Sequence, residues 1–145
     1  MQFSGPDGLL PTLKLAAGEM AELSREPVNL KRLIIVLDDD SAVRHSLMFL
    51  LTIEGFEVRS YASPMELLND ANLPAFHCLI VDFHMSEMDG LGVVETLRER
   101  KNCPHAILVT SHPNAAIRER AAKLGVPVVV KPFRGTELVD AIHAA

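Results

Sequence analysis

The run Cys78-Leu79-Ile80-Val81-Asp82 decides the fold class of this 145-residue chain. Its apolar residues end in a carboxylate, and the loop Phe83–Gly90 follows directly. An unbroken apolar run of this length is typical of a strand that is buried on both faces of a parallel sheet. The carboxyl ends of parallel strands share one edge of an open sheet, and ligands bind at that edge. The pattern therefore places Asp82 where a ligand is expected.

Other apolar runs end in polar groups in the same way. They are Ile34–Leu37 before Asp38-Asp39-Asp40, Ala106–Val109 before Thr110-Ser111, and Val128–Val130 before Lys131-Pro132-Phe133. A further strand is expected at Glu57–Tyr61. Helical spacing of apolar residues lies between the strands, and Ser41 is expected to cap the first helix. The alternation predicts a doubly wound α/β fold with a five-stranded parallel sheet, strand order 2-1-3-4-5 and helices on both faces.

Residues 1–30 differ from the rest of the chain. They contain several prolines, and apolar residues recur at roughly helical spacing, at Leu13, Ala16, Ala17, Met20, Ala21 and Leu23. We expect an N-terminal arm here that is either disordered or a short amphipathic helix. The folded domain is expected over residues 31–145, a length that suits one core.

The composition of the chain argues against a nucleic-acid-binding protein, a membrane protein and a secreted protein. The net charge of −5 argues against a nucleic-acid surface, which needs a basic patch. No apolar stretch reaches the roughly 18 residues of a membrane span, and the first residues do not resemble a signal peptide. Cys78 and Cys103 lack metal-ligand spacing, so both are expected to be buried thiols, which fits a reducing cytoplasm.

The polar groups at the strand ends suggest a specific chemistry. If Asp38, Asp39 and Asp82 converge, like charges about 4 Å apart repel by roughly 4 kcal/mol at an effective dielectric near 20. A hard divalent cation such as Mg²⁺ relieves this repulsion and binds phosphate oxygens as well. Asp82 could then attack phosphorus as a nucleophile, while Lys131 and the hydroxyl of Thr110 bind phosphoryl oxygens.

These residues together resemble the receiver domain of bacterial two-component response regulators. The resemblance covers about residues 33–145, and its motifs are Asp38-Asp39, Asp82 with Met85–Gly90, Thr110, and Lys131-Pro132-Phe133. It implies a flavodoxin-like fold and a signalling switch rather than an enzyme. It also implies that Asp82 accepts phosphate from a sensor histidine kinase or a histidine phosphotransfer protein.

The resemblance further assigns the binding groups. It implies a Mg²⁺ ion held by Asp38, Asp39, Asp82 and the backbone carbonyl of His84, with Thr110 and Lys131 at the phosphoryl group. Phosphorylation would change binding to a downstream protein partner. Because the chain ends at Ala145, we expect a stand-alone receiver, with a fragment of a longer regulator as the alternative and a homodimer as one possible state.

His84 and His112 depart from the pattern of the family that the chain resembles. Each follows a site residue by two positions, Asp82 and Thr110 respectively. In the family these positions flank the path of the water that hydrolyses the acyl phosphate, so two imidazoles there are expected to modulate hydrolysis. The alternative is that both are exposed loop histidines that face solvent.

Two other functions remain open. The Asp38-x-Asp40 start also fits haloacid-dehalogenase-type phosphatases, in which Asp38 would be the nucleophile. Those enzymes need a second acidic pair late in the chain, and after Lys131 only Glu137 and Asp140 remain. The other alternative is a pseudo-receiver, a docking module that never takes phosphate.

Overall fold

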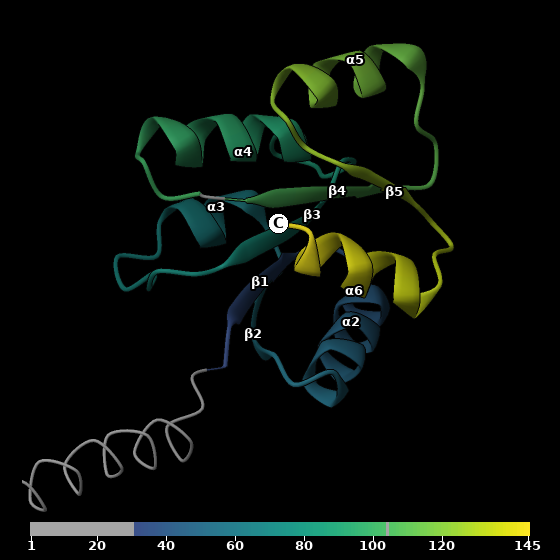
Figure 1. The fold of residues 1–145 in the computed structure, drawn as a ribbon. Helices are drawn as coiled ribbons and strands as arrows, with labels where there is room; N and C mark the ends of the chain where they lie inside the picture. The colour runs from purple at the N-terminus through teal and green to yellow at the C-terminus, as the bar shows by residue number, and fades with distance from the viewer. Residues whose placement is uncertain (1–30, 104) are drawn as a thin grey trace, which may run out of the picture. The chain divides into compact units, whose positions relative to one another are not determined.

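Five parallel strands form the centre of the computed structural model, which describes residues 31–145 apart from residue 104 (Figure 1). The strands are β1 (Leu33–Leu37), β2 (Glu57–Tyr61), β3 (Cys78–Asp82), β4 (Ala106–Thr110) and β5 (Val128–Val130). Their order in the sheet is β2-β1-β3-β4-β5. The predicted fold class and strand order are therefore confirmed. The predicted arm at residues 1–30 lies outside the described residues.

Helices cover both faces of the sheet, as the sequence predicts. The helices are α2 (Ser41–Ile53), α3 (Pro64–Leu68), α4 (Gly90–Glu99), α5 (Ala115–Lys123) and α6 (Gly135–His143). Figure 1 shows α2 and α6 on one face and α3, α4 and α5 on the other. The central strands alternate between the two cores, so that Ile35 packs on the α3–α5 side and Ile34 on the α2–α6 side. Burial on both faces explains why these strands are apolar throughout.

Strand register brings the polar strand ends together at one edge. Leu37 pairs with Val81, Asp82 with Val109, and Thr110 with Val130. The residues that follow β1, β3, β4 and β5 therefore leave the sheet at the same edge. This is the arrangement expected from the sequence, and it positions the candidate site.

The cap of α2 differs from the prediction. Asp40, not Ser41, is the N-cap, because the backbone of Asp40 is extended (φ −89°, ψ 114°) while Ser41 is already helical. The Asp40 carboxylate accepts the N–H groups of Ala42 and Val43 at 2.9 and 3.3 Å. Asp40 is thus occupied at the helix end and is not one of the acids that face the site. At α3 the N-cap is Ser63, whose Oγ accepts the N–H of Glu66 at 3.1 Å.

Within the described residues, no helix has the length and apolar character needed to cross a bilayer. Cys78 and Cys103 are buried free thiols, as predicted. Burial raises the pKa of Cys78 to about 12, so this thiol stays protonated at neutral pH.

Gly90, the first residue of α4, lies directly against the backbone of Asp82. A Cβ atom at Gly90 would stand 2.3 Å from the carbonyl oxygen of Asp82. The N–H of Gly90 donates to the carbonyl of Phe83 at 3.0 Å and closes the loop after β3. Only a residue without a side chain allows this approach.

Gly90→Ala is expected to destabilise the fold by about 1–3 kcal/mol, because the added methyl group must push α4 away from β3. The midpoint of urea unfolding measures this. Gly92→Ala is the matched control, since a Cβ there meets its nearest atom at 3.5 Å. It should leave stability unchanged or raise it, because alanine favours a helix. Equal effects of both substitutions would contradict the close approach.

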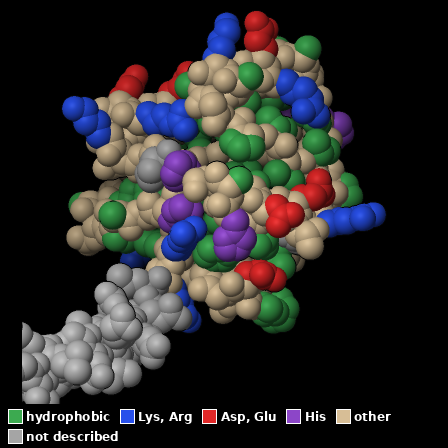
Figure 2. Space-filling view, viewed as in Figure 1, with side chains coloured by type: hydrophobic (Ala, Val, Ile, Leu, Met, Phe, Trp, Pro, Cys, Tyr) green, Lys and Arg blue, Asp and Glu red, His purple; other side chains and the backbone are tan. Residues whose placement is uncertain are grey.

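Three histidines meet at the opposite end of the sheet, away from the acids. Figure 2 shows histidine side chains gathered on the face that carries the end of α6. The rings of His77 and His105 lie 5.5 Å apart, and the ring of His77 lies 3.4 Å from Arg32 and 3.5 Å from the carbonyl of Ile142. Burial lowers the pKa of His77, and Arg32, His105 and His143 lower it further. Protonation is therefore less favourable in the folded state.

The free energy of unfolding should fall on acidification because of His77. The unfolded chain binds the His77 proton more readily, so the contribution of His77 is complete above its ordinary pKa near 6.5 and declines as the pH drops toward the lower folded pKa. His77→Gln, which cannot be protonated, should lose less stability than the unmodified chain between pH 7 and pH 5.5. Urea unfolding at both pH values measures the difference. His45→Gln, at an exposed position of α2, is the control.

Candidate functional site

Two buried carboxylates share one ammonium group at the carboxyl edge of the sheet. The side chain of Lys131 places its Nζ 3.1 Å from Oδ2 of Asp38 and 3.3 Å from Oδ1 of Asp82. Asp38 is 2% exposed and Asp82 8% exposed. Residues from β1, β3 and the segment after β5 are thereby held in one cluster. The sequence predicts this convergence, but not that Lys131 would contact Asp38.

Burial sets the electrostatics of this cluster. Desolvation raises the pKa of Asp82, and the Coulomb repulsion of Asp38 and Asp39 raises it further, while Lys131 opposes the rise. Desolvation lowers the pKa of Lys131, but the hydrogen bond and charge of Asp38, together with Asp82, outweigh it and raise that pKa. The ammonium group therefore stays charged and partly neutralises the acids.

Asp39 completes the acidic cluster. Asp38, Asp39 and Asp82 each offer a carboxylate oxygen, and these oxygens lie within 4.8 Å of one another. Asp39 is exposed, so one side of the cluster is open to solvent. Oxygen ligands of this kind, with room for water, suit a hard divalent cation. The cluster could thus bind a metal ion, as the sequence predicts.

Thr110 lies beside Lys131 through strand pairing. The N–H of Lys131 donates to the carbonyl of Thr110 at 2.9 Å. The Thr110 side chain is fully buried, and its Oγ1 accepts the N–H of His112 at 3.3 Å. The hydroxyl is therefore hydrogen-bonded within the loop after β4. The Lys131–Pro132 peptide bond is cis, which the sequence left open.

His84 and His112 are both exposed in the structure. His84 follows Asp82 in the loop after β3, and its ring stacks edge-on against Phe83 at 4.9 Å. His112 lies in the loop after β4. Both histidines belong to loops that leave the sheet at the edge where the acids meet, and the role of the His84 carbonyl in a metal shell stays a prediction.

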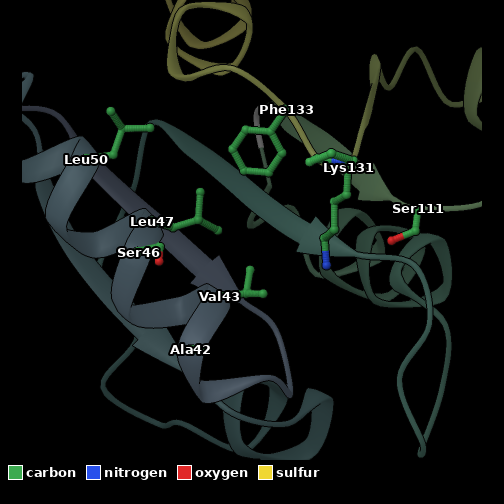
Figure 3. Close-up of a pocket in the computed structure, with 9 residues that line it drawn as sticks. Ala42, Val43, Ser46, Leu47, Leu50, Ser111, Lys131 and Phe133 are labelled. Atoms are coloured by element: carbon green, nitrogen blue, oxygen red, sulfur yellow. The ribbon is translucent and has the colours of Figure 1, made fainter.

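A groove of about 640 Å³ adjoins Lys131 between α2 and the segment after β5 (Figure 3). Figure 3 shows Lys131 reaching toward the ends of the central strands, with the Phe133 ring and α2 beside it. The lining is mostly apolar and comprises Ala42, Val43, Ser46, Leu47, Leu50, Ser111, Lys131, Pro132 and Phe133. Lys131 therefore contributes part of its surface to this groove.

Sequence reasoning missed two arginines near the site. Arg44 donates to the backbone carbonyl of Asp38 at 2.7 Å and so holds the end of β1. Arg120 on α5 forms an ion pair of 2.8 Å with Asp89, in the loop after β3. The position of Arg44 six residues after Asp38 hinted at the first contact, whereas nothing local in the sequence indicates the second.

Comparison with known proteins agrees with this geometry. The family model of the response regulator receiver domain matches residues 34–143. The chain belongs to this family. It is 40% identical over 113 residues to the response regulator protein TodT of Pseudomonas putida, covering 77% of this chain and 50% of that protein. It is also 32% identical over 111 residues to the transcriptional regulatory protein FixJ of Rhizobium meliloti, covering 76% and 54%.

The receiver therefore spans about half the length of these curated relatives. Among solved structures, the chemotaxis protein CheY4 of Vibrio cholerae matches with a TM-score of 0.73 at 22% identity, over 79% of this chain and 98% of that one. This likeness shows the fold. The family places the receiver in two-component signalling, as the resemblance in its sequence implies.

Lys131→Met should strengthen Mg²⁺ binding at the acidic cluster. The ammonium group contacts two of the three acids, so it competes with any cation there. At an effective dielectric near 20, losing this repulsion is worth on the order of 1–3 kcal/mol, or about 5- to 150-fold in affinity. Isothermal titration calorimetry with MgCl₂ measures it. Lys123→Met, an exposed site on α5, is the control. Weaker binding in Lys131→Met would contradict this competition.

Proposed function

We propose that Asp82 of this receiver domain accepts a phosphoryl group from a phosphohistidine and works as a Mg²⁺-dependent signalling switch. The observation that supports this most is the contact of the buried Asp82 carboxylate with Lys131 at 3.3 Å, beside Asp38 and Asp39. A carboxylate next to a fixed cation and an acidic metal cluster suits attack on phosphorus, where positioning and charge neutralisation provide most of the catalysis.

The proposed transfer exchanges one bond to phosphorus for another. An oxygen of the Asp82 carboxylate forms a bond to phosphorus, and the bond from phosphorus to the imidazole nitrogen of the donor breaks. The electron pair stays on that nitrogen, and the product is an acyl phosphate. The ammonium group of Lys131 neutralises one phosphoryl oxygen, which requires it to give up a carboxylate contact. The hydroxyl of Thr110 donates to another phosphoryl oxygen.

We propose Asp38, Asp39, Asp82 and the backbone carbonyl of His84 as the protein's ligands for Mg²⁺. The bound ion would supply neutralisation of the charge on the nucleophile and the phosphoryl oxygens. Asp38 is well placed for this role, because its Oδ1 accepts the N–H of Asp40 at 2.9 Å and its carboxylate is held toward Lys131.

The partners are proposed from the same features. The phosphoryl donor would be a sensor histidine kinase or a histidine phosphotransfer protein, and the groove beside Lys131 leaves space for its approach. Phosphorylation would shift the receiver between two conformations and change binding to a downstream protein. The receiver would then be a signalling module that turns over no external substrate.

The phosphatase alternative receives no support from the site. Glu137 and Asp140, its only acids after Lys131, are exposed on α6. Glu137 accepts the N–H of Arg134 at 3.1 Å and so caps that helix. Across the residues that the structure describes, the acidic metal cluster is the one at Asp38, Asp39 and Asp82. Asp38 is therefore better explained as a ligand than as a nucleophile.

Incubation with acetyl phosphate and MgCl₂ should add one phosphoryl group to the protein, as measured by intact mass. Asp82→Asn should abolish the adduct, because an amide does not attack phosphorus. Peptide mapping after borohydride reduction locates the labelled acid. No adduct on the unmodified chain would favour the pseudo-receiver, and a label on Asp38 would favour the phosphatase.

We also propose that His84 and His112 modulate hydrolysis of the acyl phosphate. Both side chains are exposed, in the loops that follow β3 and β4, so water can reach their imidazoles. The double variant His84→Ala/His112→Ala should change the dephosphorylation half-life by up to about a hundredfold, the lower end of what one positioned proton-transfer group contributes. The decay of the phosphorylated mass measures this. An unchanged half-life would show that both are merely solvent-facing loop residues.

A further inference from the structure

Asp89 lies where the loop after Asp82 meets two helices. It is the N-cap of α4, and its Oδ1 accepts the N–H of Gly92 at 2.7 Å. Its other oxygen, Oδ2, accepts from Nη1 of Arg120 on α5 at 2.8 Å. Nη2 of the same guanidinium reaches Oε1 of Glu95 at 3.3 Å. Arg120 therefore ties α5 to the first turns of α4 through two carboxylates.

The α4 end of this link is rigidly joined to Asp82. Gly90 follows Asp89 directly and lies so close to the Asp82 carbonyl that no side chain fits between them. The N–H of Gly90 bonds the carbonyl of Phe83, and the N–H of Phe83 bonds the carbonyl of Val109. A shift of the backbone at Asp82 must therefore displace the backbone at Asp89.

The other end of the link, α5, has little apolar anchoring. Ile117 and Ala121 are its buried residues. Its first turn follows Thr110 through a short loop, in which the Thr110 hydroxyl accepts the N–H of His112. The helix is thus joined to the site at two points, by the loop from Thr110 and by the guanidinium of Arg120.

Asp89 and Arg120 both keep their charges near neutral pH. Burial alone raises the pKa of Asp89, but the hydrogen bonds from Arg120 and from the N–H of Gly92 outweigh burial and lower it. The bond to Asp89 raises the pKa of Arg120. Both groups remain charged, and the fork of the guanidinium fixes the geometry better than a single ammonium group could.

We infer that Arg120 is a positioning residue that couples the backbone of the Asp82 loop to the placement of α5. This inference rests on the proposed phosphorylation of Asp82. When Asp82 is modified, displacement of the loop passes through Asp89 to the guanidinium and moves α5, the helix with the fewest buried residues on its face of the sheet. Without the guanidinium, only the loop from Thr110 joins α5 to the site, and the movement of α5 becomes smaller.

The test compares amide chemical shifts of the unmodified chain, Arg120→Met and Lys123→Met, before and after addition of MgCl₂ and beryllofluoride. Beryllofluoride stands in for the phosphoryl group. In Arg120→Met the shift changes over Ala115–Lys123 should fall by at least half, while those at Asp82 and Thr110 persist. Lys123→Met removes an exposed ion pair to Glu119 within α5 and should respond like the unmodified chain.

Further variants distinguish coupling of the Asp82 loop to α5 from a role of Arg120 in stabilising the fold. Arg120→Lys keeps the charge and should recover more than half of the α5 response. A purely structural role would lower the urea midpoint of Arg120→Met and leave its α5 response intact, and that result would overturn the inference. If the unmodified chain shows no response at Asp82, and acetyl phosphate adds no mass, the proposed function itself fails. A normal adduct with an undiminished α5 response in Arg120→Met refutes the coupling alone.

Discussion

The structure depends on one buried electrostatic contact, in which the ammonium group of Lys131 bridges the carboxylates of Asp38 and Asp82. Burying carboxylates is unfavourable unless they are paired and hydrogen-bonded. A single cation shared by two acids leaves the cluster negative, and Asp39 adds to that charge at its open side. The site is therefore stable in the fold and also ready to bind a further cation.

The surroundings of this contact keep its geometry fixed. Arg44 holds the carbonyl of Asp38, and Gly90 lets α4 pack directly on the carbonyl of Asp82. The acids thus sit on backbone that is restrained from two directions, which suits a reaction that depends on positioning. By contrast, α5 is attached through few buried side chains, so the rigid site and the weakly anchored helix lie at the two ends of the Asp89–Arg120 pair.

Much of the fold and of the site could be predicted because the signals are local. The unbroken apolar strands indicated a parallel sheet, and the acids, hydroxyl and ammonium group at their ends indicated one shared edge. The sequence predicted the cap of α2 at Ser41, one residue after the true cap, Asp40. Several neighbouring aspartates and a serine are all suitable cap residues, and only the backbone angles distinguish them. The ion pair of Asp89 with Arg120 could not be predicted, because it joins residues 31 apart that no shared periodicity connects.

The sequence by itself determined the fold class, the strand order and the identity of the acids, because buried parallel strands require continuous apolar runs and the chain leaves each of them at the same edge. Tertiary structure alone decided which groups neutralise those acids and at what distance. That choice depends on where long side chains such as Lys131 and Arg120 reach across the fold, and a flexible side chain has no partner until the strands and helices around it are packed.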